Sequence, residues 1–202
     1  MGNELYLYWM SELRKANTDY PYFVTFTIVG WIDLFTRERY CEIIIDSLKY
    51  CITNKGLKVH EYVIMPGHIH MIIQHLDCKL PDVIRDFKSF TAKEIIKAVS
   101  QPGESRKDWI LYLFQYFAKK TKQNKENMVW RKTGHPIELN YNEIYEQKAE
   151  YIRMNPVTSG YVTDEQFWKY SSAGLDSPLK LMDGGLMARG QDDNCHSAQP
   201  SD

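Results

Sequence analysis

Two apolar runs separated only by Pro66 and Gly67 constrain the fold more than any other stretch of this chain. Leu57–Met65 and His68–Leu76 are rich in β-branched and other apolar residues, which is typical of strands. A Pro-Gly pair is a turn signal, and so short a link joins two strands as an antiparallel hairpin. The sequence therefore predicts an antiparallel sheet.

Apolar periodicity predicts the other elements around this hairpin. Tyr22–Trp31 is a run of β-branched and aromatic residues and is expected to be a strand. Apolar residues then recur at helical spacing from Tyr40 to Cys51, and Gly56 is expected to end that helix. Three more helices are predicted, over Leu80–Ser100, Arg106–Lys122 and Tyr141–Met154.

Proline positions indicate where two of these helices begin and end. Pro81 suits the first turn of the helix that starts at Leu80. Pro156 disfavours helical conformation at Asn155, so the last helix is expected to end there. Between these helices, Met128–Asn140 mixes aromatic, basic and turn residues and is expected to be a short strand or an irregular segment.

The order strand, helix, strand, strand, helix predicts an α+β sandwich in which helices cover one face of an antiparallel sheet. A chain of 202 residues suits one domain, whose predicted bounds are 1–175. Residues 176–202 are polar and rich in glycine, which predicts a disordered tail.

Charge is distributed unevenly along the chain, although it nearly cancels overall at a formal net charge of -1. Twelve Lys and Arg against five Asp and Glu lie between Arg85 and Lys132, whereas two against five lie between Asp176 and Asp202. The basic stretch suits a phosphate backbone. A solvated helix face would give the same pattern, so charge alone does not identify a partner.

Cysteine usage and hydropathy indicate a cytoplasmic protein without membrane segments. The four cysteines are Cys41, Cys51, Cys78 and Cys195, which form no Cys-x-x-Cys pair and follow no secretory signal. They are therefore expected to be reduced thiols. No apolar run is long enough to span a bilayer.

His68 and His70 are separated by one residue in the second strand of the predicted hairpin. Side chains at i and i+2 of a strand point to the same face, so the two imidazoles are expected to project together. Neutral imidazole is a common metal ligand, and such a pair has the geometry to bind one ion. Histidines on a half-exposed sheet face are also ordinary polar positions, so a metal site requires a third ligand from elsewhere.

The helix that contains Tyr151 and Asn155 offers the missing groups. Their i, i+4 spacing places a phenol and an amide oxygen on one helix face. Two imidazoles and one amide oxygen, with positions left open, suit Mg²⁺ or Mn²⁺ better than a structural zinc. A free tyrosine, with a pKa of about 10, is a weak nucleophile at neutral pH, but a metal that draws electrons from a phosphoryl oxygen eases its attack on phosphorus. The alternative is a core aromatic beside an ordinary Asn-Pro helix stop.

Three motifs in order resemble those of a known family. "MPGHIHMII" at 65–73, followed by "EYIRMNPVTSGYV" at 150–162 and "WKYSSA" at 168–173, resembles the REP-associated tyrosine transposases. These are single-tyrosine transposases of the HUH superfamily, named for histidine, hydrophobe, histidine, and are similar to insertion-sequence transposases. The resemblance runs from about Tyr22 to Ala173, and "WRKTGHPIEL" at 130–139 resembles one subgroup of the family.

The resemblance implies a ferredoxin-like α+β fold with a C-terminal helix that carries the tyrosine, and an enzyme that nicks and rejoins single-stranded DNA near hairpins. Carried over by position, His68, His70 and Asn155 are ligands of a Mg²⁺ or Mn²⁺ cofactor. Tyr151 is then the nucleophile, which forms a 5′-phosphotyrosine and frees a 3′-hydroxyl. The implied assembly is a homodimer on single-stranded hairpin DNA, in the bacterial cytoplasm and at the nucleoid when bound.

Basic residues outside these motifs are candidates for DNA contact. Four lie on the predicted helix Leu80–Ser100 and are expected to contact phosphates: Arg85, Lys88, Lys93 and Lys97. Trp130 is a candidate for stacking an unpaired base, while Arg131 and Lys132 hold its phosphate. Packing in the core is the alternative for this indole.

Two functions from different classes fit these residues. The first is a transposase that nicks and joins DNA, which the complete set of two histidines, tyrosine and asparagine favours. The second is a catalytically inactive protein that binds single-stranded or hairpin DNA and descends from such an enzyme. A metal-dependent hydrolase with water as the nucleophile is disfavoured, because no acidic cluster lies near the histidines.

Overall fold

A computed structural model describes residues 20–77, 79–121, 126–132 and 136–181. Its strands are β1 (Tyr22–Thr27), β2 (Lys58–Met65), β3 (His68–Gln74) and β4 (Ile137–Glu138). Its α-helices are α2 (Glu38–Lys55), α3 (Leu80–Ser100), α4 (Lys107–Lys120) and α5 (Asn142–Thr158). Three short 3-10 helices are η1 (Val29–Trp31), η2 (Leu34–Thr36) and η3 (Glu165–Phe167).

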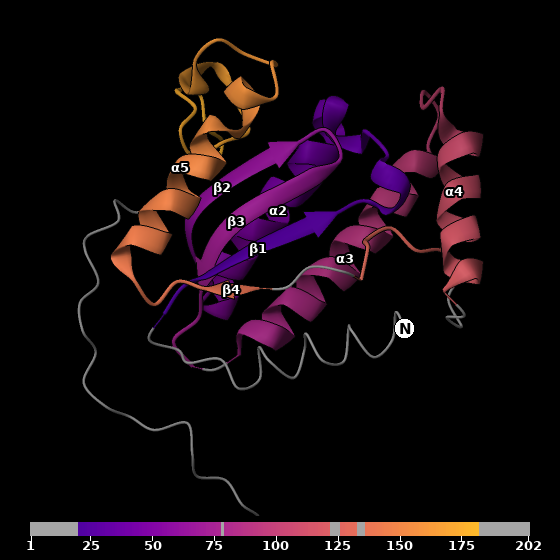
Figure 1. Cartoon of the computed structure of the whole chain (residues 1–202). Helices are drawn as coiled ribbons and strands as arrows, with labels where there is room; N and C mark the ends of the chain where they lie inside the picture. Colours follow the sequence, from indigo (N-terminus) through magenta and orange to yellow (C-terminus); the bar gives the residue numbers. More distant parts are fainter. Residues whose placement is uncertain (1–19, 78, 122–125, 133–135, 182–202) are drawn as a thin grey trace, which may run out of the picture.

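The predicted hairpin is confirmed and lies within a four-stranded sheet. β2 and β3 pair antiparallel, with Met65 opposite His68 across the turn. β1 pairs antiparallel with the other edge of β3 and β4 pairs with β1, so the strand order is β2-β3-β1-β4 (Figure 1). The elements from β1 to β4 follow the β-α-β-β-α-β order of a ferredoxin-like fold, with α4 added before β4. The predicted α+β fold with an antiparallel sheet is therefore confirmed.

Helices cover both faces of this sheet. Successive residues of a strand point to opposite faces, and on β3 Met71 belongs to the larger core with residues of α2 and α3. Its neighbour Ile72 points the other way and packs with Ala149 and Ile152 of α5. The prediction of helices on one face thus describes α2 and α3, whereas α5 forms a second layer on the opposite face of the sheet (Figure 1).

The last helix continues past its predicted end. α5 runs through Pro156 to Thr158, so the prediction that it stops at Asn155 is wrong. Proline has no backbone N–H, so it removes one hydrogen bond from a helix. The other backbone hydrogen bonds of the last turn can still form. Here the Ser159 N–H donates to the Asn155 carbonyl (3.0 Å), and Pro156 is itself buried. Packing of the proline ring therefore outweighs the local preference.

The connection from β1 to α2 lies against the hairpin turn. β1 ends at Thr27 rather than at the predicted Trp31, because Gly30 adopts a φ of 64° and turns the chain into η1. Gly67 permits the close approach, since a Cβ there would lie 3.2 Å from the carbonyl oxygen of Trp31. The Ile28 N–H also donates to the Gly67 carbonyl (3.0 Å). These contacts hold Trp31 beside the start of β3.

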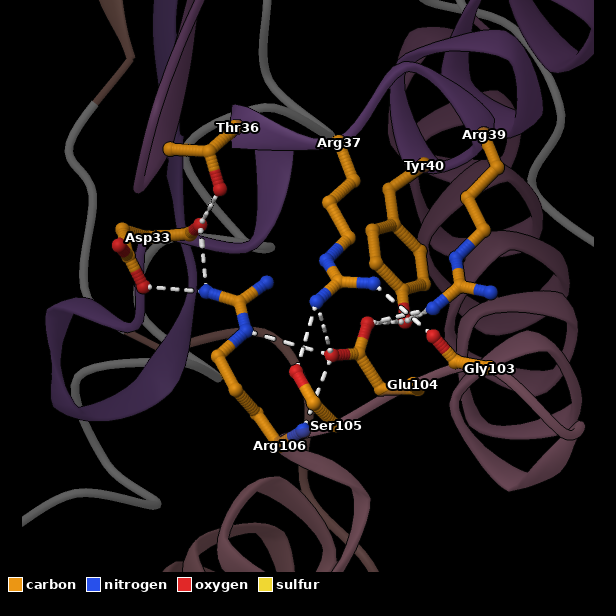
Figure 2. Close-up of polar contacts among 9 residues, drawn as sticks. All are labelled: Asp33, Thr36, Arg37, Arg39, Tyr40, Gly103, Glu104, Ser105 and Arg106. Carbon is orange, nitrogen blue, oxygen red and sulfur yellow. Dashed lines mark hydrogen bonds and ion pairs between the residues drawn. The ribbon is translucent and has the colours of Figure 1, made fainter.

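A buried carboxylate ties this connection to the loop between α3 and α4 (Figure 2). Glu104 accepts hydrogen bonds from Arg39 Nη2 (2.5 Å), Tyr40 Oη (2.7 Å) and Arg106 Nε (3.3 Å). Arg106 Nη1 also donates to the Asp33 carboxylate (2.8 Å). Burial alone would raise the pKa of Glu104, but the hydrogen bonds from these three side chains outweigh it and lower the pKa to about 2.

Glu104→Gln should lower the free energy of unfolding at neutral pH by about 1–3 kcal/mol, because the carboxylate is buried while its arginine partners are a quarter to a third exposed and can be hydrated instead. The pKa of this carboxyl is lowered in the folded state, so its contribution is present above its ordinary pKa of 4.5 and is lost as pH falls toward 2. Urea unfolding should show that the difference in free energy of unfolding between the wild type and Glu104→Gln is smaller at about pH 3 than at about pH 7.

The matched control is Glu94→Gln, which removes a carboxylate paired with Lys97 at 3.6 Å on the surface of α3. An exposed pair of this kind contributes at most about 1 kcal/mol. Equal destabilisation by the two substitutions would contradict a structural role for the buried cluster.

The segment after η3 returns to the sheet. The Ser177 and Tyr62 hydroxyls are hydrogen-bonded at 2.7 Å, and Leu179 is 4% exposed within the larger core. The packed part of the chain therefore extends beyond the predicted boundary at 175. The rest of the predicted tail, 182–202, lies outside the described residues.

Two of the four predicted thiols are within the described residues. Cys41 and Cys51 are buried and free, and burial raises the pKa of Cys41 to about 12. Cys78 and Cys195 lie outside the described residues. Across the described ranges, no helix combines the length and the apolar character that a membrane span requires.

Candidate active site between the sheet and α5

β3 brings both histidines to the face of the sheet that α5 covers. The ring centroids of His68 and His70 lie 4.7 Å apart, because residues two apart on a strand share a face. His70 is 6% exposed, whereas His68 is half-buried. The imidazoles therefore project together, as their spacing predicts.

The surroundings of both histidines favour the neutral imidazole. Burial lowers the pKa of His70 to about 3, and the nearby charges of His68 and Lys148 act in the same direction. Burial also lowers the pKa of His68. Neutral imidazole is the form that binds metal ions.

β1, which pairs with β3, fixes the orientation of the His70 ring. Thr25 lies directly opposite His70 in the strand register, with Oγ1 2.8 Å from Nδ1. When Nδ1 carries the proton, it donates to Thr25, and Nε2 keeps its lone pair for the site. Phe23 stacks on the same imidazole, with ring centroids 5.5 Å apart. The sequence alone did not indicate these two residues, because their role depends on the pairing of β1 with β3.

α5 places Tyr151 against His70. The phenol Oη lies 3.4 Å from His70 Nε2, and the ring centroids are 5.1 Å apart. Phe23 contacts the Tyr151 ring edge-on at 6.0 Å. Tyr151 is nevertheless 46% exposed, so a ligand from solvent can reach its side chain. The alternative of a buried core aromatic at this position is therefore wrong.

Lys148 lies one helical turn before Tyr151 and adds positive charge to the site. Its Nζ is 5.9 Å from the centroid of the Tyr151 ring and 5.2 Å from that of Phe23. An ammonium at this position attracts a bound phosphate. The i, i+3 spacing from Tyr151 is the only sequence signal for this residue.

Asn155 lies one turn after Tyr151 and is 9% exposed. Within the ranges that the structure describes, no group of three or more His, Cys, Asp or Glu can hold a metal ion. Among the described residues, a candidate third ligand of another kind is the Asn155 amide oxygen, on the same helix as Tyr151. Two neutral imidazoles and an amide oxygen are donors that could hold one divalent ion.

The predicted phosphate-binding residues of α3 do not join this site, because α3 lies in the other helical layer. Arg85 pairs with Asp82 at 2.6 Å, and Lys97 pairs with Glu94 at 3.6 Å. Lys93 is exposed. DNA that contacts both these cations and Tyr151 would have to pass around an edge of the sheet.

Lys88 has a different role from the other cations of α3. Its Nζ donates to the Arg131 carbonyl (3.1 Å) and lies 5.2 Å from the centroid of the Phe26 ring. Burial lowers the pKa of Lys88 to about 8. Lys88 therefore stabilises the segment before β4 rather than extending its charge into solvent.

Trp130 is a core residue. It is 6% exposed, and its Nε1 donates to Thr91 Oγ1 (3.0 Å). Its ring contacts Phe26 at 6.2 Å, so of the two predicted roles the structure supports packing, and a base has no access to this indole. Arg131 and Lys132 are half-buried, and the Arg131 guanidinium lies over the exposed ring of Trp31.

Comparison with known proteins gives a family and a similar solved structure. A family model described as "Transposase IS200 like" matches residues 31–131, which are half of the chain and include both histidines but not Tyr151. Among solved structures, the chain is similar to one described as "Structure of the REP associates tyrosine transposase bound to a REP hairpin". That match has 15% identity and a TM-score of 0.54 and covers 76% of each chain, which shows a shared fold. Comparison with curated proteins gave no match.

Proposed function

The chain belongs to the family of IS200-like transposases, and from this premise we propose that it nicks and rejoins single-stranded DNA near hairpins through a 5′-phosphotyrosine at Tyr151. The observation that carries the proposal is the distance of 3.4 Å between Tyr151 Oη and His70 Nε2. This distance brings the exposed Tyr151 side chain on α5 to the histidine pair, which lies within the residues that the family model matches.

In the proposed nicking step, Tyr151 Oη attacks the scissile phosphorus. The Oη–P bond forms as the P–O3′ bond breaks, and the electron pair of that bond goes to the 3′-oxygen. The phenol proton leaves to water, and the 3′-oxygen takes up a proton from water. The 5′-phosphate of one fragment is then esterified to Tyr151, while the other fragment ends in a free 3′-hydroxyl.

The residues around Tyr151 prepare it for this step. Phe23 contacts both the phenol and the His70 ring, so it holds the two in one geometry. Lys148 supplies a positive charge beside the phenol that attracts the scissile phosphate. A Mg²⁺ or Mn²⁺ ion held by His68, His70 and Asn155 would polarise the phosphoryl oxygen when bound.

Rejoining is the reverse reaction in this proposal. A 3′-hydroxyl attacks the phosphotyrosine, the new P–O3′ bond forms, and the P–Oη bond breaks to return the phenol. The ester retains the free energy of the cleaved bond, so no nucleoside triphosphate is needed. We place this activity in the bacterial cytoplasm and propose a homodimer that binds single-stranded hairpin DNA. The similar solved transposase, which is bound to a REP hairpin, supports the choice of a hairpin ligand.

The exposed cations of α3 are proposed to bind DNA phosphates outside the active site. Replacing Lys93 and Lys97 by alanine should then lower the salt slope of DNA binding by up to about 1.4, at about 0.7 for each phosphate contact to a single strand. Titrations of a labelled hairpin strand over a range of salt concentrations measure the slope. Replacing Lys119 and Lys120 of α4 controls for the same change in net charge. An unchanged slope in the α3 variant would mean that these lysines are only solvated.

The proposed function is tested with hairpin single strands from the flanks of the gene, incubated with the protein and Mg²⁺. Because the 5′-phosphate stays on the protein, a 3′-end label should run as a protein adduct on a denaturing gel. A 5′-end label should appear in a shortened free strand. Cutting without an adduct would point to water as the nucleophile, and binding without cutting would support the inactive DNA-binding alternative.

A further inference from the structure

Trp31 is an exposed aromatic residue beside the histidine pair, and the proposed reaction leaves it without a role. Its side chain is 60% exposed. Its φ is 55°, and it is the one residue other than glycine with positive φ among those that the structure describes. This conformation is unfavourable for a residue with a large side chain. The fold therefore holds a large apolar ring in solvent at a cost.

Trp31 extends the row of rings that forms the active site. The centroid of its indole ring lies 5.5 Å from that of His68, in an edge-on contact. His68 contacts His70 at 4.7 Å, and His70 contacts Tyr151 at 5.1 Å. Tyr151 therefore stands at one end of the row and Trp31 at the other, with the two histidines between them.

The position of Trp31 is well determined by its surroundings. The approach of its carbonyl to Gly67 and the bond from Ile28 hold η1 against the hairpin turn. Two residues later, Asp33 accepts a hydrogen bond from Arg106 at 2.8 Å (Figure 2). The Trp31 ring is therefore exposed while its backbone is held in place, and a rigidly held side chain of this kind suits a binding platform.

Arg131 adds a positive charge to this platform. Its guanidinium carbon lies 5.8 Å from the centroid of the Trp31 ring. Its backbone is bonded on both sides, because its N–H donates to the Thr27 carbonyl (2.8 Å) and its carbonyl accepts from Lys88 (3.1 Å). An exposed indole with a neighbouring cation is the combination that binds an unpaired base and its phosphate.

The direction of the proposed attack indicates which base this is. In an in-line displacement, the leaving oxygen lies on the opposite side of phosphorus from the nucleophile. Tyr151 is the nucleophile, so the 3′-oxygen and its nucleoside lie on the side away from α5. With the phosphate bound at the histidine pair, Trp31 lies on that side, because the two histidines separate it from Tyr151 in the row of ring contacts.

We propose that Trp31 stacks the base of the nucleotide immediately 5′ of the scissile phosphate, with Arg131 contacting an adjoining phosphate. This inference rests on the proposed function, because it uses Tyr151 as the nucleophile. The stacked base keeps the released 3′-hydroxyl beside the phosphotyrosine, where it is available for rejoining. The subsite accepts any base, because every base has a face that can stack.

The test measures binding in a Tyr151→Phe background, so that no cutting intervenes. The probes are hairpin strands from the flanks of the gene, each with one abasic position stepped through the single-stranded flank. With Trp31 intact, the abasic position next to the cut should weaken binding by roughly 5- to 150-fold. Trp31→Ala should weaken binding of the intact strand by a similar factor. In this variant, the strand with the abasic position next to the cut should bind as tightly as the intact strand.

Two further variants make the result specific. Trp31→Phe keeps a flat ring and should retain most of the affinity, which separates stacking from any folding defect of the alanine variant. Trp109→Ala removes another exposed indole, 49% exposed on α4, and should leave binding unchanged. An abasic penalty that persists undiminished in Trp31→Ala would overturn the proposal. A sensitive position elsewhere than next to the mapped cut would overturn the assignment of the nucleotide.

The adduct assay with Tyr151 and Trp31 both intact reports separately on the proposed function. If the adduct forms but the effect of Trp31→Ala does not depend on any abasic position, only the stacking subsite is contradicted. Coupling without an adduct retains a base-binding site on Trp31 and removes the transposase chemistry.

Discussion

Tyr151→Phe should abolish the covalent protein–DNA adduct completely, because phenylalanine has no atom that can attack phosphorus. The substitution removes one oxygen and keeps the ring contacts with Phe23 and His70. The hydroxyl belongs to a residue that is 46% exposed, so its loss should change the free energy of unfolding by no more than about 1 kcal/mol. Adduct formation on a 3′-labelled hairpin strand and urea unfolding measure the two effects.

Tyr161→Phe is the matched control for this experiment. Tyr161 is 53% exposed, two residues beyond the C-cap of α5, and it contacts Trp168 rather than the histidines. The control should form the adduct as the wild type does, and both variants should bind the hairpin strand. A Tyr151→Phe protein that still becomes attached to labelled DNA would show that another residue is the nucleophile.

His68→Ala should reduce nicking by at least about 100-fold, since loss of a residue that merely orients a metal ligand already costs about 10- to 100-fold. His68 is the better choice of the two histidines because it is half-buried. His70 is 6% exposed, bonded to Thr25 and stacked on Phe23, so its replacement would also disturb packing. Initial nicking rates over a range of Mn²⁺ concentrations give the measurement, and higher Mn²⁺ should restore part of the rate.

His60→Ala controls for removal of a half-buried histidine from the sheet. His60 contacts Gln74 and Tyr145 rather than the Tyr151 site, and burial lowers its pKa as it does that of His68. Nicking should be unchanged in this control. If His68→Ala nicked at the wild-type rate at every Mn²⁺ concentration, a metal role for the histidine pair would be refuted.

Elements with strong local signals were predicted well from the sequence. α3 has the predicted bounds, Leu80–Ser100, because an apolar stripe over several turns and a proline in the first turn both favour a helix there. The hairpin of β2 and β3 was predicted because its turn and both strands are contiguous in the chain. The shared face of the histidines followed from strand geometry alone.

What the sequence left open depends on contacts between residues far apart in the chain. Trp130 is followed in sequence by Arg131 and Lys132, which makes it a candidate for DNA contact, but in space it packs on Phe26 and donates to Thr91. Trp31 was assigned to the end of a strand, yet the Gly30 turn exposes it beside His68. Apolar periodicity alone does not predict the layer that α5 occupies, because few apolar residues of this helix mark the face that meets the sheet.

The most direct test of the proposed chemistry is to identify the residue that carries the DNA. The trapped adduct is digested with nuclease and with trypsin, which cuts after Lys148 and Arg153 and releases the peptide Ala149–Arg153 with a single tyrosine. We expect mass spectrometry to find a nucleotide esterified to Tyr151 in this peptide. A nucleotide on any other residue, or cut DNA with every peptide unmodified, would contradict the assignment of Tyr151 as the nucleophile.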